Sequence, residues 1–239
     1  MFESNATDRQ NFLNADQRGP LVAGKDSFTI AEAADQLIRS APGWSALGAP
    51  ASVTYGFRSN APSAMPDDTT GFSRFNSTQI AQAELALAGW SDAANITFTR
   101  IGFGAAGENA YTDQATILLA NYSSGSDTAT AFAYYPGSTM SASAAGDVWV
   151  NITSGSNAAP TTGNYGAMVL VHELGHAIGI AHPADYQSED SPTYADNAAY
   201  YEAARPVTVM RYLRESLPGS CCGGRYSAAP LLDDIAAVQ

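Results

Sequence analysis

The feature that most constrains this chain is the segment VHELGHAIGIAHP, residues 171–183. It contains all three histidines of the 239-residue chain, His172, His176 and His182. A random soluble chain would scatter its histidines, so the clustering needs a chemical reason. A metal ion that gathers several imidazoles provides one.

The first two histidines are expected to lie on a buried helix over residues 165–178. The segment YGAMVLVHELGHAI contains no proline and is rich in apolar residues. Residues four apart share one face of a helix, so His172 and His176 can bind the same ion. Gly179 is expected to end the helix, because glycine adopts the left-handed conformation at little cost. The reversed chain then returns His182 as a third ligand.

Three neutral imidazoles with an open fourth position describe a catalytic zinc site, whereas a structural site is closed by four protein ligands. Glu173 is rotated about 100° from His172 around the helix axis, so its carboxylate reaches a metal-bound water without being a ligand. We therefore expect Glu173 to be the general base. The alternatives are histidines packed in a core and an inactive metal-binding relative. Five fixed positions in H-E-x-x-H-x-x-G-x-x-H weigh against the first, and the presence of Glu173 weighs against the second.

The rest of the chain predicts an α/β (α+β) fold with a mixed sheet. Residues 1–26 are polar and lack a sustained period, so they are interpreted as an N-terminal extension or prosegment. In residues 27–239, Ser27 or Thr29 is expected to cap the first helix. The expected helices cover residues 27–40 and 77–94, and the expected strands cover residues 51–59, 96–103, 115–123, 130–137 and 146–153.

Composition excludes several classes of function. The chain has 23 Asp and Glu against 11 Lys and Arg, a formal net charge of -12, which argues against a nucleic-acid partner. No apolar run approaches the ~20 residues that cross a bilayer, and the N-terminus lacks the pattern of a signal peptide. The adjacent Cys221 and Cys222 are interpreted as part of a surface turn. A monomer is expected, because no heptad pattern is present.

The zinc motif resembles the metzincin zinc endopeptidases, whose signature is H-E-x-x-H-x-x-G-x-x-H followed by a methionine turn. Proline after the third histidine is similar to the serralysin branch of bacterial secreted proteases. The segments FNSTQIAQAELALAGWSDAANITFT, AFAYYPGS, GDVWVN and YSAAPLLDDIAAVQ also resemble serralysin catalytic domains. The resemblance implies a two-lobed zincin-like fold. The upper lobe would extend to about residue 179 and contain a mostly parallel twisted sheet with an antiparallel edge strand. A small lower lobe would cover residues 180–239.

The same resemblance implies further site residues. In TVMRYL, Met210 would form the floor under the zinc, and the Tyr212 phenol would bind zinc at rest and donate to the oxyanion during turnover. The edge strand would pair with an extended protein or peptide substrate by β-augmentation. Its residues are Ala131, Phe132, Ala133, Tyr134 and Tyr135.

Three departures from the serralysin pattern stand out. Arg211 occupies a position where the family usually has a small serine, and serralysins generally have no counterpart of Cys221 and Cys222. The chain stops at Gln239, where serralysins continue into a calcium-binding β-roll that carries the secretion signal. We expect either an isolated or processed protease domain, or a protein exported with help from a separate β-roll domain or secretion partner. Binding of Ca²⁺ is left open.

The sequence therefore predicts a secreted, extracellular zinc endopeptidase with one catalytic Zn²⁺. The alternative is an inactive zinc-binding adhesin or interaction module. A self-inhibited zymogen is compatible with the first reading. In that case the N-terminal stretch would cross the cleft, with Asp8, Asp16 or Asp26 as the carboxylate that blocks zinc.

Overall fold

A computed structural model describes most of the chain. The described residues are 14–19, 21–22, 24–39, 42–66, 68–125, 129–138, 144–184, 193–203, 207–211 and 224–239. The predictions for Tyr212, Cys221, Cys222 and Asp8 lie outside these residues.

A five-stranded sheet forms the centre of the fold, with the order β2-β1-β3-β5-β4. Strands β1, β2, β3 and β5 run parallel, and β4 pairs antiparallel with β5 at one edge. This confirms the predicted mixed, mostly parallel sheet with an antiparallel edge strand. The strands are β1 Ala51–Phe57, β2 Ile96–Arg100, β3 Ile117–Tyr122, β4 Ala131–Ala133 and β5 Val148–Asn151.

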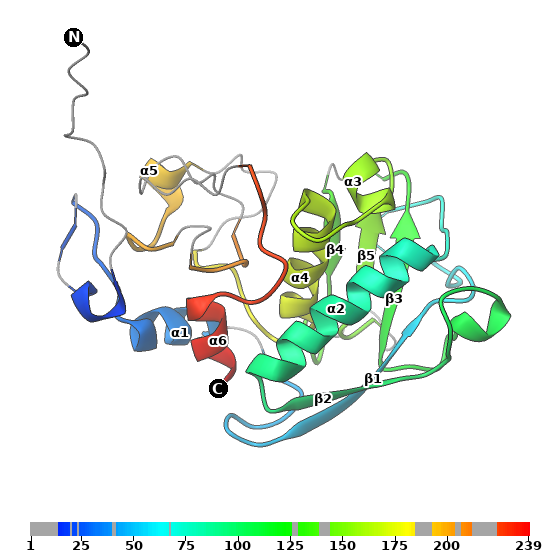
Figure 1. Ribbon diagram of the computed structural model, residues 1–239, viewed down its shortest axis with the longest axis horizontal. Coiled ribbons are helices and arrows are strands. Elements are labelled where there is room, and N and C mark those ends of the chain that lie inside the picture. The colour runs from blue at the N-terminus through cyan, green and yellow to red at the C-terminus, as the bar shows by residue number, and fades with distance from the viewer. Residues whose placement is uncertain are drawn as a thin grey trace, which may run out of the picture.

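Two long helices cover one face of the sheet (Figure 1). Helix α2 spans Ser77–Ala93, and its first turn is capped by the Asn76 side chain, which accepts from two backbone N–H groups. Helix α4 spans Tyr165–Ala177, close to the predicted residues 165–178. The indole N–H of Trp90 on α2 donates to the Val171 carbonyl on α4 at 2.9 Å, so the two helices are joined inside the core.

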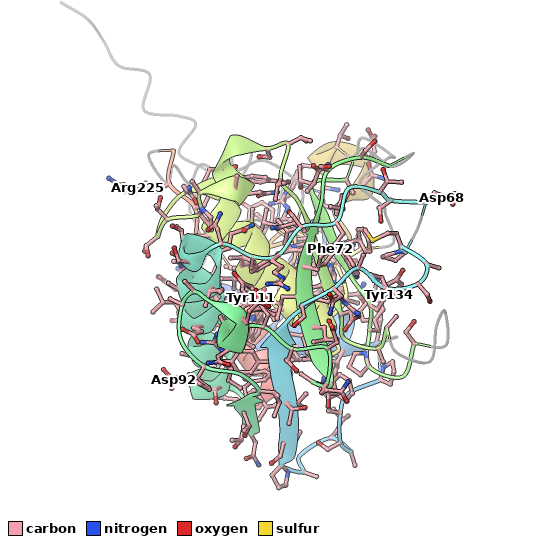
Figure 2. The ribbon with its side chains drawn as sticks, turned by 90° about the vertical axis from the view of Figure 1, so that its right-hand side faces the viewer. Asp68, Phe72, Asp92, Tyr111, Tyr134 and Arg225 are labelled. Atoms are coloured by element: carbon pink, nitrogen blue, oxygen red, sulfur yellow. The ribbon has the colours of Figure 1, made fainter. Side chains whose placement is uncertain are left out.

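The opposite face of the sheet carries a separate aromatic cluster. Tyr122 and Trp149 are buried there, and Phe72, Phe132 and Tyr134 pack against them. Figure 2 shows Tyr134 on the side of the sheet away from α2. Because side chains alternate along a strand, Ala131 and Ala133 face the main core while Phe132 faces this cluster.

The helices near the two ends of the described chain, α1 Ile30–Ile38 and α6 Leu232–Val238, lie side by side (Figure 1). Thr29 caps α1 in a capping box with Glu32, which confirms one of the two predicted caps. Helix α6 was not predicted, and four shorter elements also escaped prediction because each is too short to show a period. They are η1 Ala15–Gln17, η2 Glu108–Ala110, α3 Gly155–Ala158 and α5 Tyr194–Asn197.

Part of the predicted N-terminal extension packs closely onto the rest of the chain. Arg18 is buried and forms a two-pronged ion pair with Asp233 of α6, at 2.6 and 3.1 Å. The Arg18 Nε atom also lies 4.0 Å from Glu202. Within the described ranges, no helix is both long enough and apolar enough to span a membrane.

Candidate metal centre

Helix α4 carries the first two histidines, and both lie inside the protein. His172 and His176 lie one turn apart, and only 3% and 6% of their surfaces are exposed. Nearly every residue of the helix is buried, which explains its apolar sequence. The two imidazoles are therefore held inside the protein by a buried helix.

The chain reverses directly after α4 and brings back the third histidine. Gly179 has φ +107°, and a Cβ there would lie 2.7 Å from the Pro42 carbonyl oxygen, so glycine is required on two grounds. The returning segment is held by the end of α1 and by Arg39, the residue that follows it. The Ala181 N–H donates to the Leu37 carbonyl at 2.7 Å, and Arg39 donates to the His182 carbonyl at 2.7 Å.

The three Nε2 atoms form a compact triangle. The distances are 3.1 Å between His172 and His176, 3.0 Å between His176 and His182, and 3.3 Å between His172 and His182. Three nitrogens of a tetrahedral zinc, each about 2.05 Å from the ion, would lie about 3.3 Å apart. The triangle therefore has the size that zinc requires, with little adjustment.

The opposite ring nitrogens fix the tautomers of the two helical histidines. Nδ1 of His172 lies 2.7 Å from the Val209 carbonyl oxygen, and Nδ1 of His176 lies 2.7 Å from the Ile180 carbonyl oxygen. Each Nδ1 must carry the proton to donate to a carbonyl, which leaves both Nε2 atoms as acceptors. Two acceptors 3.1 Å apart cannot bond to each other. A cation between them satisfies both, so the donor set fits zinc.

Burial keeps these histidines uncharged. It lowers the pKa of His172 to about 4, although the bond to the Val209 carbonyl acts in the other direction. Burial also lowers the pKa of His176 well below its usual value, and the neighbouring imidazoles add to this effect. At neutral pH both rings therefore have a lone pair ready for a metal ion.

Glu173 is buried beside the histidines, with 3% of its surface exposed. Burial raises the pKa of its carboxyl group to about 8. Together with His172 it borders a small cavity of about 30 Å³. The other lining residues are Thr130, Tyr165, Met168, Val169 and Arg211.

Met210 lies directly against α4 and is completely buried. A Cβ on Gly175 would lie 2.5 Å from the Met210 sulfur and 3.0 Å from a ring carbon of Trp90. The glycine between the first two histidines therefore allows the methionine segment to approach the helix. The guanidinium of Arg211, the next residue, lies 5.5 Å from the Tyr194 ring centre.

The structure divides the five predicted substrate-binding residues into groups. Ala131, Phe132 and Ala133 form the edge strand β4, but the Phe132 and Tyr134 side chains pack in the aromatic cluster on the outer face of the sheet. Only the Tyr135 ring meets the metal centre, edge-on to His176 at 5.4 Å between ring centres. Burial raises the pKa of the Tyr135 phenol, Arg39 lowers it, and Glu173 raises it.

Sequence reasoning missed the groups that support the histidines from behind. These groups are the backbone carbonyls of Val209 and Ile180, the Arg39 side chain and the carboxylate of Asp234. Backbone carbonyls leave no signal in a sequence. The pair of acids in the apolar segment PLLDDIAAV was the one visible clue, because buried carboxylates need partners.

The amino-acid sequence is similar to those of known peptidases. The profile of the matrixin family of peptidases covers residues 52–202. Serralysin C of Dickeya chrysanthemi is 40% identical over 92% of this chain and 45% of its own length. Metalloprotease AprA of Pseudomonas entomophila is 40% identical over 94% of this chain and 46% of its own length. A serralysin of Photorhabdus sp. is 36% identical over 91% of this chain and 46% of its own length.

The chain thus spans about half the length of the curated relatives that it matches. The match to the matrixin profile includes the sheet except for Ala51, together with α2, α4 and all three histidines. The predicted resemblance to a metzincin catalytic domain of the serralysin type is confirmed. The chain belongs to the matrixin family of peptidases.

Proposed function

We propose that this chain is a zinc-dependent endopeptidase that hydrolyses peptide bonds of extended protein substrates. The observation that carries the proposal is the triangle of three Nε2 atoms with the buried Glu173 carboxyl group beside it. His172, His176 and His182 hold the ion. Zinc held there supplies the Lewis acidity that polarises a peptide carbonyl and activates water.

Glu173 acts as the general base and then as the general acid. Its carboxylate takes the proton of the attacking water and delivers that proton to the leaving amine. Its place next to His172 on α4, at the border of the small cavity that His172 also lines, supports this role. In our proposal Tyr212 donates to the oxyanion, and Met210 forms the floor under the metal.

The substrate lies along the edge of the sheet. Strand β4 is the last strand of the described sheet and pairs with β5 on one side, so an extended peptide would add along its other side by β-augmentation. Ala131 and Ala133 contribute backbone groups to this pairing, and Tyr135 contributes its ring next to His176. Recognition through backbone implies tolerance of many side chains.

The setting of the enzyme is also a proposal. We infer a monomer that is secreted to the extracellular space and acts there on proteins, together with a separate β-roll domain or secretion partner. The roughly doubled length of the serralysin relatives supports such an additional domain.

Hydrolysis of a fluorescently quenched casein tests the activity, with the parent protein compared with Glu173→Ala at measured zinc content. We expect near one zinc per chain in both proteins. Activity should fall at least ~100-fold in the variant, because general acid–base catalysis contributes about 10²–10⁴. If the parent binds zinc but cleaves nothing, even after removal of residues 1–13, the proposal is wrong and an inactive zinc-binding module takes its place.

A further inference from the structure

Helix α6 places a fully buried carboxylate behind the metal centre. Asp234 has no exposed surface. Its Oδ1 atom accepts from the Thr208 hydroxyl at 2.5 Å, and its Oδ2 atom accepts from the Val209 N–H at 2.8 Å. Oδ2 also accepts from the Leu231 N–H at the start of its own helix, at 2.8 Å. Both partners outside the helix therefore lie in the segment that leads into Met210.

That segment contacts the metal ligands directly. The Val209 carbonyl oxygen lies 2.7 Å from Nδ1 of His172, and the Met210 N–H donates to the Thr208 hydroxyl at 3.0 Å. Val209 is thus held by Asp234 through its N–H group, and it holds His172 through its carbonyl. A continuous chain of hydrogen bonds leads from α6 to the imidazole.

We propose that Asp234 is a positioning residue for the metal centre, which acts through Thr208 and Val209 to orient His172 and to seat Met210 under the ion. The inference rests on the proposed zinc-binding function of His172. Outer hydrogen-bond partners of metal ligands typically change metal affinity by about 10- to 100-fold. A bond to a charged acceptor is also stronger than one between neutral groups, so it fixes the segment more firmly.

The neighbouring carboxylate provides an internal comparison. Asp233 lies on the same helix, is equally buried, and pairs with Arg18 instead of with the methionine segment. Its backbone N–H donates to the Val207 carbonyl at 2.9 Å, but none of its described side-chain bonds reaches Thr208, Val209 or Met210. Loss of either carboxylate removes a buried polar contact, and only loss of Asp234 breaks the connection to His172.

The experiment compares Asp234→Asn with Asp233→Asn in the full chain at pH 8. This pH lies above the pKa of about 7 to which burial raises Asp234. Zinc affinity is measured by competition with a chelator, and cobalt-substituted protein gives a visible spectrum that reports ligand geometry. Asp234→Asn should weaken zinc binding about 10-fold or more and shift the cobalt bands. Asp233→Asn should lower the melting temperature, leave the zinc affinity within twofold of the parent and leave the cobalt bands in place.

A pair of variants at Thr208 covers the case in which Asp234→Asn fails to fold. Thr208→Val keeps the volume but removes the hydroxyl that joins Asp234 to Met210, whereas Thr208→Ser retains the hydroxyl. We expect weaker zinc binding in the valine variant and parent-like binding in the serine variant. Equal zinc affinity in the two Thr208 variants, or in the two aspartate variants, would overturn the inference. Neither readout requires hydrolysis, so a parent that binds zinc without cleaving casein would remove the proposed activity and leave this test intact.

Discussion

His172 and Glu173 are neighbours on α4, and the same buried environment acts on both. Burial disfavours whichever form is charged, so it lowers the pKa of the imidazole to about 4 and raises the pKa of the carboxyl group to about 8. In metal-free protein at neutral pH, both groups are therefore mainly uncharged. A doubly charged ion changes this balance, because it favours the ionised carboxylate next to it.

The raised pKa of Glu173 has a consequence for stability. A carboxyl group whose pKa is higher in the folded state than in the unfolded state binds more protons when folded. The stability of metal-free protein should therefore fall as pH rises from about 4.5 to about 8, by up to about 1.4 kcal/mol per pH unit. Glu173→Gln cannot ionise, so it should be more stable than the parent at pH 8 by at least ~1 kcal/mol, or about 2–4 °C in melting temperature.

Thermal unfolding of both metal-free proteins between pH 5 and pH 8 measures this effect. Other buried carboxyl groups, such as Asp147 and Asp234, contribute the same trend to both proteins, so the difference between the two curves isolates Glu173. A difference that stayed constant over this range would show that Glu173 is ionised in the metal-free protein.

The last turn of α1 and the following residue, Arg39, hold the returning segment that carries His182. The Leu37 carbonyl accepts from the Ala181 N–H, Gln36 donates to the Pro183 carbonyl at 3.0 Å, and Arg39 donates to the His182 carbonyl. These bonds fix three consecutive residues of the returning segment, Ala181, His182 and Pro183. The two helical ligands need no such support, because α4 itself sets their spacing.

Arg39→Met should therefore weaken zinc binding without unfolding the protein. The loss of the charge-assisted bond that the exposed Arg39 makes to the His182 carbonyl predicts a decrease of roughly threefold to tenfold in affinity. Arg74→Met is the matched control, because Arg74 forms an ion pair with the exposed Glu108 instead of with a ligand strand. Stopped-flow zinc release to a chelator compares the two variants. Equally fast release from both would refute a specific role of Arg39.

At the scale of the whole molecule, Arg18 connects the beginning of the described chain to its end. Its guanidinium pairs with Asp233, 215 residues away, and lies near Glu202. Glu202 in turn accepts from the Ser27 hydroxyl and from the Phe28 N–H. This buried network joins residues 18–28 to Glu202 and to α6.

Two chains shortened at the N-terminus distinguish a role of the N-terminal residues in inhibition from a role in stability. A chain that begins at Asn14 keeps the network and should be as stable as the parent. A chain that begins at Ser27 leaves Asp233 buried without Arg18, which predicts a loss of about 3–5 kcal/mol, since removal of one partner from a buried ion pair has this effect. Chemical denaturation measures both. If the chain that begins at Ser27 were as stable as the parent, residues 14–26 would be a dispensable extension. Faster hydrolysis of casein by the chain that begins at Asn14 would indicate self-inhibition by residues 1–13.

The parts of this protein that depend on short-range geometry could be predicted from its residues. The 3.6-residue helical period places His172 and His176 on one face, and a glycine at position 179 allows the reversal that returns His182. The Thr29 cap, the strand positions and the mixed sheet follow from local pattern in the same way. The family resemblance added Met210, which lies against Gly175 in the fold.

The surroundings of these residues could be seen only in the folded chain. No periodicity indicates that the Val209 carbonyl meets His172, that Asp234 lies behind Val209, or that Arg18 finds Asp233. It also took the packed sheet to show that Phe132 and Tyr134 turn away from the metal centre while Tyr135 faces His176. The physical reason is that such contacts join segments far apart in the chain, and their partners are selected by packing and by the need to satisfy buried polar groups.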